Sequence, residues 1–282
     1  MRVVGNVMSA TALDTGGSAL ISPMNDHWRV WGNEFKDTGY DPPINLTHAI
    51  YASDGASDLD IGWNNAHDLM VGHVFQVHTD AVPGGPSGYL FTDVRIHDNV
   101  ITAKRPGDCR GINIGNGLGG SYGSIYNNIL TNIGQSFSGI AIYSGDWNIY
   151  NNTFYNILGS GPSGAMVWIQ GTGVPVTATV RNNIFYSDGV TPYINAYGSA
   201  SMGEITLSNN VYYNHGSGPT QDGAAINANP LFVDPTTSDF RLRSGSPAID
   251  TGSFTVNSVV VRDREGTSRP QGAAFDIGAY ER

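Results

Sequence analysis

The chain has 282 residues, 40% of them apolar and 13% charged, with a formal net charge of −10. The apolar fraction is sufficient for a large core and argues against disorder, and the negative charge disfavours nucleic acid and anionic membrane surfaces as partners. No apolar run approaches the roughly 20 residues of a membrane-spanning helix, and the single cysteine excludes an internal disulfide framework.

One short pattern recurs through the first 212 residues. It consists of an aliphatic residue, an asparagine three positions later, and an apolar residue two positions after that. A repeat with one strand-like unit per period indicates a stacked solenoid. Successive asparagines of the pattern lie 24 to 35 residues apart; they are Asn6, Asn33, Asn64, Asn99, Asn128, Asn152, Asn183 and Asn210.

Three repeat folds compete for this pattern. Leucine-rich repeats share the spacing, but they need further leucines and a helical return segment, whereas the return segments here carry Gly, Ser and β-branched residues. A left-handed β-helix needs a six-residue period, which the sequence lacks. We therefore expect an all-β fold, a single-stranded right-handed parallel β-helix with about three strands per turn.

The recurring asparagine has a physical role in such a coil. Asn tolerates the left-handed backbone conformation of a tight corner, and its amide can bond to the equivalent amide about 4.8 Å away on the next turn. The flanking apolar residues, such as Ile149 and Phe154 around Asn152, are expected to point inward. From Asn127 onward the residue before the ladder is also Asn, which thickens the polar corner.

A second strand is expected between successive asparagine units, beginning with Gly or Ala followed by an apolar residue. Loops of varied length follow these strands, and insertions in a solenoid usually gather on one face, which is often the binding face. The expected strands begin at Ala19, Ala49, Ala81, Gly111, Gly139 and Ala165.

The repeat stops after Tyr213. We expect residues 1–215 to form the β-helix turns, and residues 216–282 to form an irregular C-terminal cap packed on the last turn. The tail contains four distinctive stretches: NPLFVDP at 229–235, DFRL at 239–242, SPAID at 246–250 and DIGAYE at 276–281.

Repeat and tail together resemble the right-handed parallel β-helix proteins of the pectate-lyase-like superfamily. The tail is similar to that of secreted bacterial β-helix proteins, and the two resemblances cover almost the whole chain. They imply an extracellular or cell-surface protein that acts on polysaccharide, among lyases, glycoside hydrolases, epimerases, tailspikes and non-catalytic relatives. No signal peptide precedes the first asparagine unit, so we expect the chain to start at a boundary within a longer solenoid.

The residues just before the expected second strands point to a site. His48, Asp80 and Arg110 hold this position on three successive turns, so they should stack about 4.8 Å apart. A histidine, a carboxylate and an arginine form a workable acid–base set. The alternative is a purely structural role, in which an Asp80–Arg110 ion pair fixes the corner and His48 is a hydrogen-bonded residue at the strand end. Strict alternation would even turn this position inward.

The predicted chemistry is β-elimination of an acidic, uronate-containing polysaccharide. The uronate carboxylate must be neutralised, and either Arg110 or Ca²⁺ could do this. A base must then remove the C5 proton, and an acid must protonate the leaving oxygen. Candidate bases are His48, His78 and Lys104; Asp80 and Asp108 would hold the calcium; Arg105, Trp63 and Tyr51 would bind the substrate.

Two alternatives to a lyase stay open. A glycoside hydrolase needs two carboxylates about 5–10 Å apart, for which Asp80 with Asp108, or Asp54 with Asp80, are candidates. A non-catalytic, glycan-binding surface β-helix needs neither arrangement. In every case the expected partner is a polysaccharide, with no nucleic acid and no membrane insertion.

Overall fold

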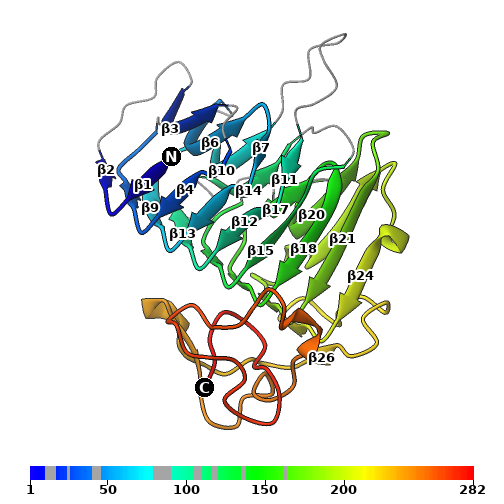
Figure 1. The fold of residues 1–282 in the computed structure, drawn as a ribbon. Helices are drawn as coiled ribbons and strands as arrows, with labels where there is room; N and C mark the ends of the chain where they lie inside the picture. Colours follow the sequence, from blue (N-terminus) through cyan, green and yellow to red (C-terminus); the bar gives the residue numbers. More distant parts are fainter. Residues whose placement is uncertain are drawn as a thin grey trace.

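Most of the chain forms a parallel β-solenoid. The computed structural model describes residues 1–9, 17–23, 26–39, 46–78, 90–103, 109–115, 120–134, 138–159, 161 and 164–282. Strands stack along one axis and the chain returns to the same sheets turn after turn (Figure 1). The expected all-β parallel β-helix is confirmed. Among the described residues, no helix is long and apolar enough to cross a membrane.

Three parallel sheets run the length of the solenoid. The first comprises β1 (Arg2–Val4), β4 (Arg29–Trp31), β8 (Asp60–Gly62), β12 (Val94–His97), β15 (Tyr122–Tyr126), β18 (Gly145–Tyr150), β21 (Val176–Arg181) and β24 (Ile205–Ser208). The second comprises β2 (Val7–Ser9), β5 (Glu34–Lys36), β9 (Asn65–Leu69), β13 (Val100–Ala103), β16 (Ile129–Thr131), β19 (Thr153–Tyr155), β22 (Ile184–Tyr186), β25 (Val211–Tyr213) and β26 (Ile226–Asn227). The third comprises β3 (Gly17–Pro23), β6 (Thr47–Ser53), β10 (His73–His78), β14 (Arg110–Ile114), β17 (Ser138–Ile142), β20 (Ala165–Gly171) and β23 (Ile194–Gly198).

Short elements complete the chain. The pair β7 (Ala56–Ser57) and β11 (Phe91–Thr92) is parallel, whereas β27 (Phe232–Asp234) and β28 (Asp239–Leu242) form an antiparallel pair in the tail. Three 3₁₀ turns are present among the described residues: Met202–Glu204, Pro235–Thr237 and Phe254–Val256.

The predicted asparagine ladder is confirmed at the corner between the first and second sheets. Oδ1 of Asn64 accepts both the backbone and the side-chain N–H of Asn33, each at 3.0 Å, and the same pair of bonds repeats at each step from Asn6 to Asn210. The ladder ends on Asp222, whose carboxylate accepts from the Asn210 side chain at 2.8 Å. Every rung is thus satisfied in the buried corner, where an unpaired amide would be costly.

The left-handed backbone conformation belongs to the residue before each rung, not to the ladder asparagine itself. This residue has φ between 52° and 67° on all eight occasions; the series is Gly5, Gly32, Trp63, Asp98, Asn127, Asn151, Asn182 and Asn209. The two consecutive asparagines therefore have different structural roles. One residue makes the corner, where Asn, Asp and Gly are favoured, and the next builds the ladder.

The C-terminal tail lies along the side of the solenoid, by the carboxyl ends of the first-sheet strands (Figure 1). Corner asparagines hold it: Asn127 donates to the carbonyl of Arg262 at 2.8 Å, and Asn151 to that of Asp276 at 2.9 Å. Tail residues such as Phe240 pack with second-sheet residues such as Ile184 in one apolar cluster. Residues 216–282 contact the last turn, through the β25–β26 pair and Asp222, and they also contact earlier turns, because the corner asparagines offer bonding partners there.

The third-sheet strand between β6 and β14 is not the one that the sequence predicted. The strand predicted to begin at Ala81 lies outside the described residues, and the third-sheet strand of that turn is β10, which runs from His73 to His78. It pairs with β6 on one side and β14 on the other.

Candidate functional site

A column of polar residues crosses the amino-terminal ends of the third-sheet strands. In register, Ser18 pairs with His48, His48 with His73, and His73 with Arg110. The prediction of Asp80 between His48 and Arg110 is therefore wrong, because His73 occupies that position. The histidine and the arginine remain on alternate strands of one column, two steps or about 10 Å of sheet apart.

This column lies on the outer side of the sheet. The next residues along the strands, Ala49 and Val74, belong to the main core. Ala165, which continues the column on β20, packs instead with Ala141 and Trp168 in a separate cluster. The alternation breaks at the strand start, so the interior position predicted by strict alternation does not occur.

The two histidines of the column stack on each other. Their ring centroids are 5.8 Å apart, and the His48 ring also lies 5.1 Å from that of Tyr51. His48 and His73 are 6% and 9% exposed, whereas Arg110 is half-buried. The cation is thus the most accessible member of the three.

Burial lowers the pKa of both column histidines. Desolvation brings the pKa of His48 down to about 4, helped by the positive charge of His78. The pKa of His73 is lowered further by burial and by the nearby charges of Arg110, His48 and His78. Burial also lowers the pKa of Arg110, which the phenol of Tyr143 partly offsets. Both column histidines are therefore neutral at pH 7.

Polar side chains continue this face beyond the column. Tyr51, Gln76 and Asn113 are in register on adjacent strands, and Asn113 donates from Nδ2 to Oε1 of Gln76 at 2.9 Å. His78 follows on the same face at the end of β10, where Gly115 leaves room for its ring. His73, Gln76 and Asn113 were not predicted as site residues, because their neighbours depend on strand register across loops of different length.

Four predicted site residues lie outside the described part of the chain: Asp80, Lys104, Arg105 and Asp108. Among the residues that are described, no group of three or more His, Cys, Asp or Glu side chains is placed to hold a metal ion. The predicted calcium ligands Asp80 and Asp108 are not among these described residues.

A second ionisable cluster occupies the outer face of the first sheet and was not predicted. Asp60 is its centre: its carboxylate accepts from Nε1 of Trp31 at 2.8 Å and from Nε of Arg95 at 3.2 Å, and contacts Nε2 of His97 at 2.9 Å. The other nitrogen of His97 lies 2.6 Å from Oδ2 of Asp98. Because both ring nitrogens face carboxylates, the geometry favours the doubly protonated ring, which donates from both.

The electrostatics of this cluster oppose those of the third sheet. Burial by itself lowers the pKa of His97, but hydrogen bonds to Asp60 and Asp98 and their charges outweigh it, so the pKa is raised. Burial raises the pKa of Asp60, yet His97, Trp31 and Arg95 bring it below its usual value. The pKa of Asp58 is also lowered, and the hydrogen bond from Arg29 is the largest cause. These carboxyl groups are held ionised.

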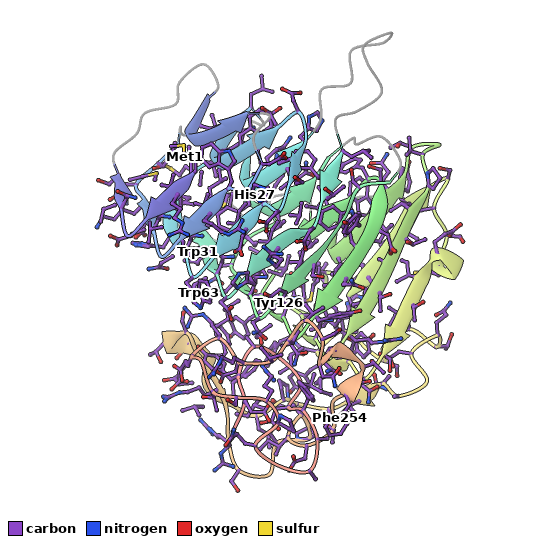
Figure 2. The ribbon with its side chains drawn as sticks, viewed as in Figure 1. Met1, His27, Trp31, Trp63, Tyr126 and Phe254 are labelled. Atoms are coloured by element: carbon purple, nitrogen blue, oxygen red, sulfur yellow. The ribbon has the colours of Figure 1, made fainter. Side chains whose placement is uncertain are left out.

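Trp63, predicted to bind substrate beside Tyr51, lies elsewhere. It occupies the corner after β8 and is 51% exposed, on the face that carries Trp31 and Tyr126 (Figure 2). Of the described candidates, His48, His78, Arg110 and Tyr51 gather on the third sheet, whereas Trp63 belongs to the first-sheet cluster.

Comparison of the sequence with models of known protein families and with curated proteins finds no match.

Proposed function

We propose that the protein binds an acidic polysaccharide along the outer face of the third sheet and cleaves it by β-elimination. The observation that carries this proposal is the column in which Arg110 follows two uncharged histidines, His48 and His73, on adjacent strands. The resemblance to secreted β-helix proteins that act on polysaccharide supports the substrate class and an extracellular or cell-surface location.

The arrangement supplies the groups that β-elimination needs. Arg110 is the cation for the uronate carboxylate, and because burial disfavours its charge, an anionic ligand stabilises it. His48 is the base, since its low pKa leaves a ring nitrogen unprotonated at neutral pH to accept the C5 proton. His73 lies between them in the strand register, and its ring stacks on that of His48.

A proton donor for the leaving oxygen is also near. Tyr143 lies close enough to Arg110 for their charges to interact, and burial raises its pKa, so the phenol keeps its proton at neutral pH. Lys104 and Arg105 belong to the proposal as further cationic contacts, and Ca²⁺ held by Asp80 and Asp108 is the alternative means of neutralising the carboxylate. All four residues lie outside the described part of the chain, so the proposed reaction steps rest on Arg110, His48 and Tyr143.

The hydrolase alternative is not favoured by the two central carboxylates of the first-sheet cluster. A hydrolase needs one protonated carboxyl group as its acid, and the pKa values of Asp58 and Asp60 are both lowered. The pairs that include Asp80 are outside the described residues and are tested together with the lyase.

The experiment is a panel assay with alginate, polygalacturonate and glycosaminoglycans, monitored by the absorbance of the unsaturated uronate product. We expect activity in the wild type and a loss of about 10²- to 10⁴-fold in His48→Gln. Arg110→Gln should raise KM and lower kcat, and His27→Gln, at an exposed histidine just before β4, serves as the control. Addition of EDTA tests the calcium alternative.

Three outcomes contradict the proposal. Reducing ends without the new absorbance identify a hydrolase. Binding without either signal identifies a non-catalytic surface protein. Full lyase activity in both His48→Gln and Arg110→Gln places the chemistry on other residues.

A further inference from the structure

Trp63 breaks the rule that the other turns follow at their corner. All eight corner residues have left-handed backbone geometry, and the other seven are Gly, Asp or Asn. Trp63 has φ 55°, a conformation in which a bulky side chain is strained. The seven other turns use residues that adopt this conformation with less strain. The strain at Trp63 therefore indicates a compensating role for the indole.

Packing alone does not supply that role. The Trp63 ring is nearly perpendicular to that of Trp31, at 5.9 Å, and to that of His97, at 4.5 Å. Even so, 51% of the residue remains exposed. The Trp63 side chain therefore points outward from the solenoid, on the face seen in Figure 2.

The two rings that contact Trp63, those of Trp31 and His97, both bind Asp60, which belongs to a network of polar groups that is fixed and nearly balanced in charge. Arg29 and Arg95 both contact the carboxylate of Asp58, and Arg95 also binds Asp60 and Asp93. With a protonated His97, the cations balance Asp58, Asp60 and Asp98, which leaves only the exposed Asp93 in excess. The cluster therefore has hydrogen-bonding groups held in place but little net charge to attract an ion.

We propose that Trp63 and Trp31, with the Arg29–Asp58–Arg95 network next to Trp31, form a second carbohydrate site. The C–H face of a pyranose ring stacks on the indole, whose π-face is negative, and its hydroxyls bond to the fixed polar groups. This site rests on the proposed function for its ligand class only. Its residues belong to the first sheet and are separate from the third-sheet column.

The size of the platform favours a sugar over a protein. An aromatic side chain offers about 150–250 Å² in all, and half of Trp63 is covered. The platform is therefore on the order of 100 Å², against roughly 800 Å² per partner in a stable protein–protein interface. One sugar ring matches this area.

The test is Trp63→Asn, which gives this corner the residue that four other turns use. If the indole serves a ligand, the variant should keep its melting temperature or raise it by about 2–4 °C, because backbone strain is relieved. Its affinity for long polygalacturonate, alginate or xylan chains, measured by affinity electrophoresis, should fall at least about tenfold. Tyr122→Asn, a first-sheet residue of similar exposure, is the matched control and should bind normally.

The outcomes separate this proposal from the lyase. Unchanged binding in Trp63→Asn overturns the site, and a lower melting temperature in the same variant would show that Trp63 only packs. Failure of the wild type to bind any of these polysaccharides also overturns the site. Trp63-dependent binding without β-elimination contradicts the proposed function alone. Binding retained in Arg110→Gln and lost in Trp63→Asn supports a site separate from the column.

Discussion

Two histidine clusters lie on the N-terminal half of the same solenoid and have opposite electrostatics. On the third sheet, His48 and His73 stack on each other beside Arg110, and their pKa values are lowered. On the first sheet, His97 lies between Asp60 and Asp98, and its pKa is raised. All three side chains are nearly buried, so burial does not explain the difference. The cross-turn neighbours decide it.

The two faces are suited to different tasks. The first-sheet carboxylates are occupied by Arg29, Arg95 and His97, so they stabilise the structure and hold it rigid. The third-sheet histidines are desolvated by burial and have no carboxylate partner among the causes of their pKa shifts, so the proton stays off their rings at neutral pH. A neutral histidine near a half-buried arginine is suited to proton transfer, whereas a histidine locked between two carboxylates is not.

The largest expected effect separates the two clusters by stability. His97→Ala leaves Asp60 and Asp98 buried without their shared cation, which should destabilise the fold by about 3–5 kcal/mol. His48→Ala uncovers no buried charge, so it should cost about 1–3 kcal/mol. Urea unfolding at pH 7 measures both. Equal losses would show that His97 is not charged in the native state.

The second prediction concerns acid. The pKa of His48 is about 4 when folded and about 6.5 when unfolded, so the unfolded chain binds the proton first as the pH falls. The stability that the neutral ring contributes is present above pH 6.5 and is lost by pH 4, amounting to about 3 kcal/mol. His48→Gln should lose that much less stability between pH 7 and pH 4.

His97 supplies the opposite control. Because its folded pKa is raised, its contribution is complete below pH 6.5 and is lost as the pH rises through the folded value. His97→Gln should therefore flatten the alkaline side of the stability profile and leave the acid side unchanged. An acid-side change in this variant would contradict the assignment.

A smaller effect tests how the first-sheet cluster is packed. A Cβ on Gly62 would lie 2.7 Å from Cε1 of His97, so Gly62→Ala should cost about 1–3 kcal/mol by displacing the ring. In the His97→Ala background this cost should disappear. A double-mutant cycle by urea unfolding measures the coupling, and additive losses would mean that the ring does not lie over Gly62.

The smallest effect is expected at the exposed edge of the network. Arg29→Met leaves Asp58 with Arg95 and His27 as partners, and partly exposed pairs contribute little. The loss should be below about 1 kcal/mol and should shrink further in 1 M salt, because the pair is screened. A salt-independent loss of several kcal/mol would indicate that packing of the arginine on Trp31, rather than charge, is what matters.

The ladder could be predicted from sequence because identical residues meet identical residues. Asn152 bonds to Asn128 and Asn183 whatever the length of the loops between them, so the pattern itself names the partners. The third-sheet column could be predicted only in part. His48 and Arg110 lie two strands apart, as expected, but the register of β10 places His73 at the position predicted for Asp80.

The contacts of the first-sheet cluster and of the tail could not be predicted from sequence, for the same reason. Asp60 and His97 are 37 residues apart and belong to different repeat positions, so no local pattern joins them. Arg269 and Glu281 of the tail form a fully buried pair at 2.9 Å, and Arg269 also reaches Asn127 across 142 residues. Such contacts arise when an irregular segment docks on a completed surface.

The sequence by itself determined the coil, its polar corner and its inward-pointing residues, because a repeat bonds each unit to a copy of itself. Only the tertiary structure decided which histidines meet carboxylates, where the tail lies, and that Trp63 stands alone at a strained corner. These depend on register between unlike turns, and loops of 24- to 35-residue repeats shift that register in ways that local periodicity does not record.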